Sequence, residues 1–133
     1  MGGRVTMTKW IVLVVVLGLF GWRYLAVAST ASVISPAELQ SMLAAKETFL
    51  LVDVREPEEV AVIGIPQAIN IPLAQLSDSL ELQNLEKDTK IVVMCRSGAR
   101  SAQAQKILGA MGFTRVLNVT GGILAWETPR EAD

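Results

Sequence analysis

The sequence predicts an α/β domain with a central, mostly parallel five-stranded sheet and helices on both of its faces. Two segments carry most of this prediction. FLLVDV at 49–54 and IVVM at 91–94 are apolar almost without interruption, as strands covered on both faces are. Between such segments stand runs whose apolar residues recur at spacings of three and four, the period of an amphipathic helix. Strands that alternate with helices form parallel sheets, because each parallel pair needs a crossover connection.

The individual elements follow in order along the chain. Val33-Ile34 is the first short strand, and residues 35–38 (SPAE) begin a helix with an N-cap serine, a proline at the first helical position and an acid three residues after the cap. After the strand at 49–54, the acidic run EPEE at 56–59 is most simply the solvated start of a helix. The remaining expected elements are a strand at 68–71 ended by Pro72, a helix at 73–85, the strand at 91–94, a helix at 100–111 stopped near Gly112, a strand at 115–117 and a helical turn at 122–126.

Composition separates the chain into two parts. The 133 residues leave room for one domain. The first 28 residues hold three basic residues and no acid, whereas residues 29–133 hold 9 Lys or Arg and 13 Asp or Glu. The part that folds is therefore mildly acidic, which argues against a nucleic-acid surface.

Residues 10–28 (WIVLVVVLGLFGWRYLAVA) are apolar except for Arg23, and they follow Arg4 and Lys9. Read as a whole, the 19 residues are long enough to cross a bilayer if Arg23 reaches the headgroups. The alternative is a signal peptide cleaved after Ala28, because Ala26-Val27-Ala28 has the small-x-small form of a cleavage site. We favour the uncleaved anchor. Both interpretations place the domain on the extracytoplasmic side of the membrane, in a periplasm or its equivalent.

The predicted organisation is then a basic N-terminus at 1–9, a transmembrane anchor or signal peptide at 10–28, a linker at 29–32, one domain at 33–128 and a tail at 129–133.

The chain has one cysteine, Cys95, and no histidine. It can form no internal disulfide, and without histidine partners the cysteine does not predict a metal site. We expect neither a metal nor a cofactor. A reactive Cys95 would need its thiolate stabilised by backbone N–H groups, a helix N-terminus or arginines rather than by a Cys–His pair.

The position of Cys95 and the loop after it favour a reactive thiol. Cys95 stands where a buried strand ends, and sites in open α/β sheets form at the carboxyl ends of strands. The loop CRSGAR at 95–100 is small and contains a glycine, so that its N–H groups can turn inward as an anion-binding nest in front of a helix N-terminus. Arg96 and Arg100 add two positive charges. An isolated cysteine is more often an inert core residue, but one followed at once by R-S-G-A-R-S is better placed to react.

Four segments resemble one family. CRSGARS resembles the active-site loop of the rhodaneses, and LLVDVREPEEV is similar to their strand-and-helix signature, with Asp53 and Arg55 in the usual places. IPQAINIPL resembles the segment that follows, and GFTRVLNVTGGILAW is similar to the last strand and its Gly-Gly-x-x-x-Trp ending at 121–126. The resemblance covers residues 33–126 and implies a rhodanese-like fold.

The resemblance also implies a persulfide mechanism. Cys95 would take sulfane sulfur from a small anionic donor such as thiosulfate and pass it to cyanide, a thiol or another protein. The loop would hold the donor and the persulfide through Arg96, Ser97, Gly98, Ala99 and Arg100. Asp53 and Arg55 are expected to be structural, as an ion pair that orients the neighbouring loop. One departure concerns the loop shape: where the family usually has Gly-His-Ile-Pro-Gly-Ala, this chain has Gly64 for the histidine and Gln67 for the second glycine.

Two other functions compete with this one. Cysteine phosphatases and arsenate reductases also cradle an oxyanion, but with C-x5-R, whereas the spacing here is C-x4-R and the next position is Ser101. A non-catalytic rhodanese-like sulfur carrier or binding module at the membrane is the second alternative. Such modules often lose the cysteine, which this chain keeps. A thiosulfate–cyanide assay would separate the three.

Overall fold

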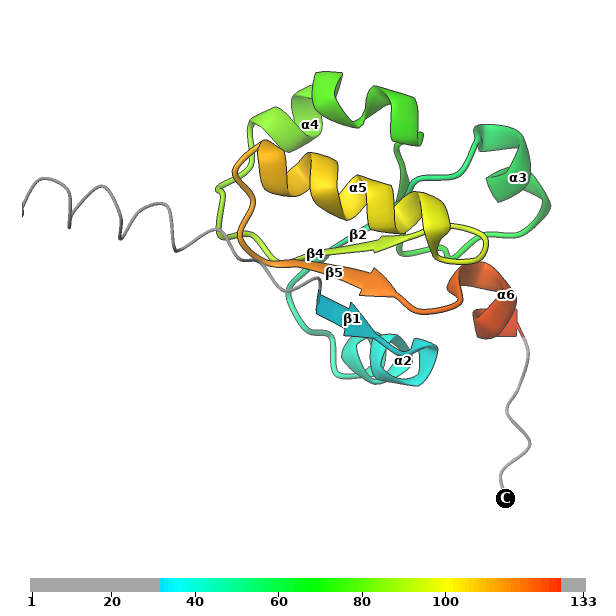
Figure 1. Ribbon diagram of the computed structural model, residues 1–133. Helices are drawn as coiled ribbons and strands as arrows, with labels where there is room; N and C mark the ends of the chain where they lie inside the picture. Colours follow the sequence, from blue (N-terminus) through cyan, green and yellow to red (C-terminus); the bar gives the residue numbers. More distant parts are fainter. Residues whose placement is uncertain (1–31, 128–133) are drawn as a thin grey trace, which may run out of the picture. The chain divides into compact units, whose positions relative to one another are not determined.

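The computed structural model describes residues 32–127, and their strands form one sheet (Figure 1). In chain order the strands are β1 (Ser32–Ile34), β2 (Leu50–Asp53), β3 (Ile69–Asn70), β4 (Ile91–Met94) and β5 (Val116–Val119). The order across the sheet is β1-β5-β4-β2-β3, and every pairing is parallel. The predicted α/β class and five-stranded parallel sheet are therefore confirmed.

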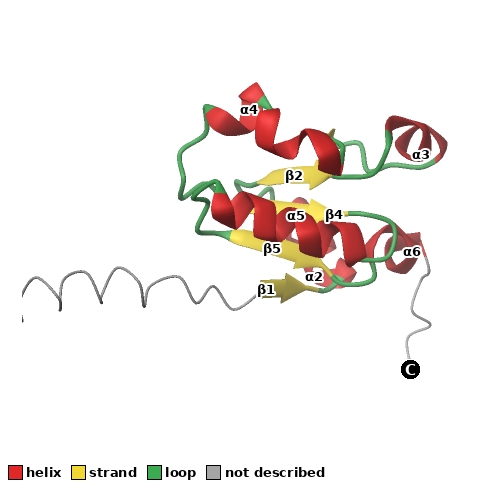
Figure 2. Cartoon of the chain, turned by 45° about the horizontal axis from the view of Figure 1, so that its top comes forward, coloured by secondary structure: helices red, strands yellow, loops and turns green. Residues whose placement is uncertain are grey.

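Helices cover both faces of the sheet (Figure 2). They are α2 (Pro36–Ala44), α3 (Pro57–Val62), the 3-10 helix η1 (Leu73–Asp78), α4 (Leu80–Gln83), α5 (Ala99–Ala110) and α6 (Gly122–Glu127). One apolar cluster joins the sheet to η1, α4 and α5, and a second joins its other face to α2 and α6. A two-sided core of this kind is what uninterrupted apolar strands require.

The alternation of side chains along β4 decides where the thiol lies. Ile91 and Val93 point into the cluster beneath α5, whereas Val92 and Met94 point into the cluster beneath α2 and α6. Successive side chains of a strand point to opposite faces, so Cys95, the next residue, belongs to the α5 side. Its thiol is thereby directed toward the N-terminus of α5.

The predicted start of α2 has the expected hydrogen bonds. The Ser35 hydroxyl accepts from the backbone N–H of Glu38 at 3.1 Å, and the Glu38 carboxylate accepts from the backbone N–H of Ser35 at 2.6 Å. This reciprocal capping box satisfies two donors that have no partner within the helix.

The single helix predicted at 73–85 is wrong. The segment divides at Ser79 into η1 and α4, because Ser79 has an extended backbone (φ −66°, ψ 117°) and caps a new helix by accepting from the N–H of Leu82. The last strand is also displaced, running over 116–119 instead of 115–117. Its polar residue Asn118 is buried, and its side chain forms hydrogen bonds with the Ser101 hydroxyl and the carbonyl of Gly98.

Between Ser32 and Glu127, no helix has both the length and the apolar character needed to cross a membrane. The predicted anchor or signal peptide at 10–28 and the predicted tail at 129–133 lie outside the described residues.

Candidate active site

The sheet changes its direction of winding between β2 and β4. These strands are neighbours, but the chain passes from β2 outward to β3 on one side and from β4 to β5 on the other. Where the connections of two neighbouring strands diverge in this way, a crevice that can bind a ligand forms at the carboxyl ends of the strands. The predicted residues Asp53, Arg55 and Cys95 all lie at this edge, because Asp53 is paired in register with Met94.

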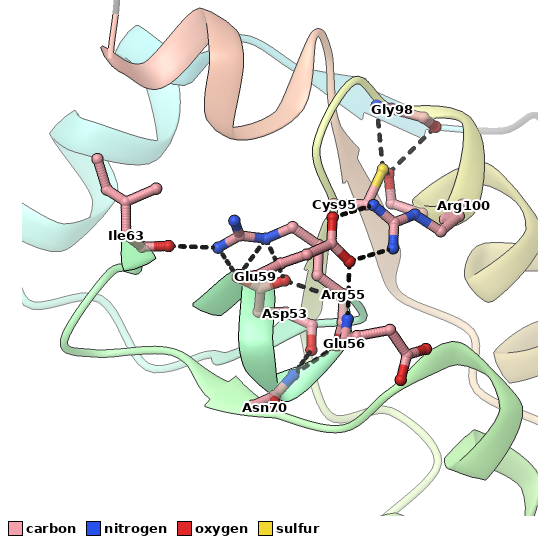
Figure 3. Close-up of polar contacts among 10 residues, drawn as sticks. Asp53, Arg55, Glu56, Glu59, Ile63, Asn70, Cys95, Gly98 and Arg100 are labelled. Atoms are coloured by element: carbon pink, nitrogen blue, oxygen red, sulfur yellow. Dashed lines mark hydrogen bonds and ion pairs between the residues drawn. The ribbon is translucent and has the colours of Figure 1, made fainter. Parts of the chain in front are cut away.

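The thiol of Cys95 lies within a turn of its own loop (Figure 3). The backbone N–H of Gly98 donates to Sγ at 3.0 Å, and the Ser101 hydroxyl lies 3.4 Å from it. The residue is 1 % exposed. A sulfur atom surrounded by donors in this way is arranged to carry negative charge.

Gly98 makes this turn possible. It is the N-cap of α5 and has φ 105° and ψ −14°, a left-handed conformation that favours glycine. The turn directs its own N–H at the thiol and begins a 12-residue helix directly beside it. Cys95 is therefore near both a backbone donor and the positive end of α5.

The pKa of the Cys95 thiol is lowered from its ordinary value. Burial alone raises it, but hydrogen bonds from the Ser101 hydroxyl and from the backbone N–H groups of Ser101, Gly98 and Ser97 stabilise the thiolate and outweigh burial. These donors thus stabilise the thiolate without the histidine that this chain lacks.

Ser101 was not predicted as a site residue. It is fully buried, and its hydroxyl also lies 2.6 Å from Oδ1 of Asn118 and 3.1 Å from the carbonyl of Gly98. A hydroxyl has one proton, so that these acceptors compete with the thiolate for it. The available signal was position: residue 101 is in the first turn of the helix that follows the cysteine.

Ser101→Ala is expected to raise the thiol pKa and to move the acid limb of persulfide formation by about one pH unit to higher pH, since a hydrogen bond to a charged group is worth roughly 1.5–3 kcal/mol. Reaction needs the thiolate, so activity falls as pH drops through the thiol pKa. The measurement is kcat/KM for thiosulfate against pH. Ser97→Ala, which retains its backbone N–H, should keep the wild-type limb. An unmoved limb in Ser101→Ala would show that the backbone donors suffice.

The Gly121-Gly122 pair allows α6 to pack against the Cys95 loop. The N–H groups of Ile123 and Leu124, in the first turn of α6, donate to the carbonyls of Cys95 and Arg96 at 2.8 and 3.1 Å. A Cβ on Gly122 would come within 2.4 Å of the Cys95 carbonyl oxygen, and its φ is 58°. Only glycine allows α6 to approach this closely.

Arg100 is paired with Glu59 (Figure 3). Its two terminal nitrogens donate to the two carboxylate oxygens at 2.6 and 2.7 Å. The hydrogen bond raises the pKa of Arg100, and the same bond, with one from the backbone N–H of Glu56, lowers the pKa of Glu59 to about 2. The role of Arg100 in donor binding stays a prediction, with its charge already neutralised in this structure.

Residues 56–59 begin a helix as predicted, with Glu56 as N-cap of α3 and Pro57 first. Glu59 has a further contact that the prediction lacked, because it connects α3 to the N-terminus of α5. Partners 41 positions apart leave no local pattern in a sequence.

The other loop residues lie at the surface. Arg96, Ser97 and Ala99 are exposed, and Gly98 is half-buried. Within residues 32–127 the Arg96 side chain has neither a hydrogen bond nor an ion pair. Arg96 therefore carries the positive charge of this loop that no neighbouring acid compensates.

Asp53 and Arg55 form a buried ion pair beside the loop. The Arg55 guanidinium donates to the Asp53 carboxylate at 2.6 Å, and the two side chains are 3 % and 0 % exposed. Arg55 also donates to the carbonyl of Ile63 at 2.9 Å, and the Asn70 amide donates to the carbonyls of both paired residues. These contacts hold the chain on both sides of α3, and the structural role of the pair stays a prediction.

The two positions that depart from the rhodanese pattern lie together. Gly64 and Gln67 line a cavity of about 250 Å³ with Trp126, and no residue of the Cys95 loop lines it. A Cβ at Gly64 would meet Val60 at 3.0 Å, so this backbone has little room for a side chain.

Comparison with known proteins agrees with this geometry. The family model described as a rhodanese-like domain matches residues 35–129. The chain is 45 % identical over 94 residues to YtwF of Bacillus subtilis, covering 71 % of this chain and 88 % of that protein. It is 43 % identical over 93 residues to a sulfurtransferase of Allochromatium vinosum, covering 70 % and 85 %.

A human relative and a solved structure extend the comparison. The human thiosulfate:glutathione sulfurtransferase is 33 % identical over 108 residues, with 72 % of this chain and 93 % of that protein covered. The crystal structure of a rhodanese-like domain protein from Staphylococcus aureus superposes with a TM-score of 0.66 at 33 % identity and covers 74 % of this chain and 94 % of that one.

Proposed function

This chain belongs to the rhodanese-like domain family, and we propose that it is a sulfurtransferase that moves sulfane sulfur from thiosulfate to a thiophilic acceptor through a persulfide on Cys95. Relatives named as sulfurtransferases support the reaction class. The name of the human relative, which includes thiosulfate, supports that donor as the first to test.

The observation that carries the proposal is the environment of the thiol. Cys95 is buried among donors, with Gly98 N–H at 3.0 Å and a lowered pKa. The same donors can stabilise the charge of a persulfide anion, which differs from the thiolate by one sulfur atom. An inert core cysteine would have no reason to be surrounded by N–H groups.

The proposed reaction has two displacements. The Cys95 thiolate attacks the outer sulfur of thiosulfate, an S–S bond forms, and the original S–S bond breaks with its electron pair leaving on sulfite. The acceptor, cyanide or a thiolate, then attacks the outer sulfur of the persulfide. The Cys95 thiolate leaves and the enzyme is restored. The two steps need no external oxidant or reductant.

Arg96→Ala is expected to raise KM for thiosulfate about tenfold, because it removes a charge-assisted contact to an anion. Arg100→Ala is the matched control and should raise KM less, since Glu59 already neutralises its charge. Steady-state kinetics with thiosulfate and cyanide measure both. An equal or larger effect of Arg100→Ala would mean that Arg100 leaves Glu59 and turns to the donor.

The proposed function is tested by incubating the purified chain with thiosulfate and measuring its mass. One added sulfur, removed again by cyanide with release of thiocyanate, is the expected result. A chain that binds thiosulfate without gaining sulfur would instead be a non-catalytic module. Hydrolysis of a phosphate ester without sulfur transfer would favour the phosphatase alternative.

We further propose that the chain is held at a membrane through residues 10–28, with the domain on the extracytoplasmic side. The support is the length and apolar character of this stretch and the basic residues before it. Full-length protein should stay in the membrane fraction after alkaline carbonate extraction. A mature form that starts at Ser29 in the extracytoplasmic soluble fraction would replace the anchor with a cleaved signal, and uncleaved chain in the cytosol would contradict both.

A further inference from the structure

A cavity of about 310 Å³ opens beside the Cys95 loop, between α3 and α6. Its apolar lining comes from Val62, Ile63, Ile123 and Leu124, and its charged lining from Arg55, Glu59 and Arg96. We call this cavity and its edge the α3–α6 groove. No step of the proposed reaction with small molecules uses its apolar part.

The edge of the α3–α6 groove is unusually apolar for a surface. Val62 is 86 % exposed, Ile63 43 % and Leu124 46 %. Elsewhere in residues 32–127 the large hydrophobic side chains with comparable exposure are Val33 and Leu80, on other elements. Exposed apolar side chains that gather around a cavity are typical of an interaction site, whereas single ones are ordinary.

The charges of the groove leave one positive group uncompensated. Arg55 is paired with Asp53, and Glu59 with Arg100. Arg96 has no such partner among the described residues. An occupant complementary to the groove therefore combines an apolar side chain with a carboxylate.

Backbone hydrogen bonds connect one side of the groove to the loop that carries Cys95. The N–H groups of Ile123 and Leu124 donate to the carbonyls of Cys95 and Arg96, so the α6 part of the apolar edge is fixed relative to the thiol. The chain has one cysteine, and its sulfur must leave to another molecule. Arg96, the residue after Cys95, lines the groove, so an acceptor bound there lies beside the reacting loop.

We propose that the α3–α6 groove binds the sulfur acceptor, and that this acceptor is a protein whose reactive cysteine has an apolar residue on one side and an acidic residue on the other. This inference rests on the proposed function. A protein fits better than a small thiol because Val62 is almost fully exposed at the edge, where an occupant confined to the cavity would leave it uncovered.

Transfer to four short peptides tests the proposal. The full-length chain, purified in mild detergent and loaded with sulfur from thiosulfate, is mixed with capped Leu-Cys-Glu, Leu-Cys-Lys, Ser-Cys-Glu or Ser-Cys-Lys. The single-turnover loss of sulfur is followed by mass, and each rate is divided by the rate with cyanide. We expect Leu-Cys-Glu to react about tenfold faster than Ser-Cys-Lys. A neighbouring lysine favours the thiolate, so intrinsic reactivity works against this result.

Variants separate the two features. Val62→Ser combined with Leu124→Ser should remove the preference for leucine over serine and keep the preference for glutamate over lysine. Arg96→Ala should remove the preference for glutamate and keep the preference for leucine. Leu80→Ser, which changes a side chain 72 % exposed on α4, is the control and should keep both. Equal rates for all four peptides, or preferences that survive the variants, would overturn the inference. If the chain gained no sulfur, or cyanide failed to remove it, the proposed function itself would fail.

Discussion

Cys95→Ser is expected to reduce sulfur transfer to the uncatalysed background while the domain stays folded. Cys95 is the one cysteine of the chain, so no other residue can carry a persulfide. The serine hydroxyl is close to the thiol in size and can accept from the N–H of Gly98, which keeps the loop's hydrogen bond. The free energy of unfolding should therefore change by no more than about 1 kcal/mol.

The measurement combines the thiosulfate–cyanide assay with thermal unfolding of the same preparation. Wild-type activity in the serine variant would refute the persulfide mechanism. Loss of activity together with loss of the folded state would require a second variant, Cys95→Ala, to separate chemistry from folding.

Asp53→Ala is expected to destabilise the domain by roughly 3–5 kcal/mol, because it leaves the Arg55 guanidinium buried without its counter-charge. The pair is almost inaccessible to water, and a fully buried charge cannot recover its hydration. Urea unfolding of the full-length chain measures the loss as a lower midpoint.

A surface ion pair provides the matched control. Lys90 and Glu47 are 3.1 Å apart, but their side chains are 25 % and 45 % exposed. Glu47→Ala should therefore cost between zero and about 1 kcal/mol. Equal losses in the two variants would show that water reaches the Asp53–Arg55 pair in solution.

Features with a local signature could be predicted from the sequence. The apolar runs at 49–54 and 91–94 identified β2 and β4, and the run SPAE identified the start of α2. The cysteine after a buried strand was placed correctly at the carboxyl edge of the sheet. These predictions hold because strand burial and helix capping depend on neighbours within a few residues.

Features that depend on distant partners could not be predicted. Glu59 appeared to be one acid among several, and only the fold brings Arg100 to it. Leucine spacing at 73–85 suggested one helix, but Ser79 ends η1 and caps α4, and a serine within a leucine pattern does not by itself predict such a break. Asn118 lay outside the predicted strand at 115–117, but it belongs to β5 and its amide oxygen accepts from the Ser101 hydroxyl of α5.

The parallel order of the strands has a consequence for orientation. The chain enters the sheet at Ser32, the amino end of β1, and Cys95 follows the carboxyl end of β4. All strands point the same way, so Ser32 and the thiol lie at opposite edges of the sheet. Strands of three to four residues separate these edges by about 10–13 Å. The peptide link that precedes Ser32 therefore lies at the edge away from the thiol, and an acceptor in the proposed reaction meets the opposite edge.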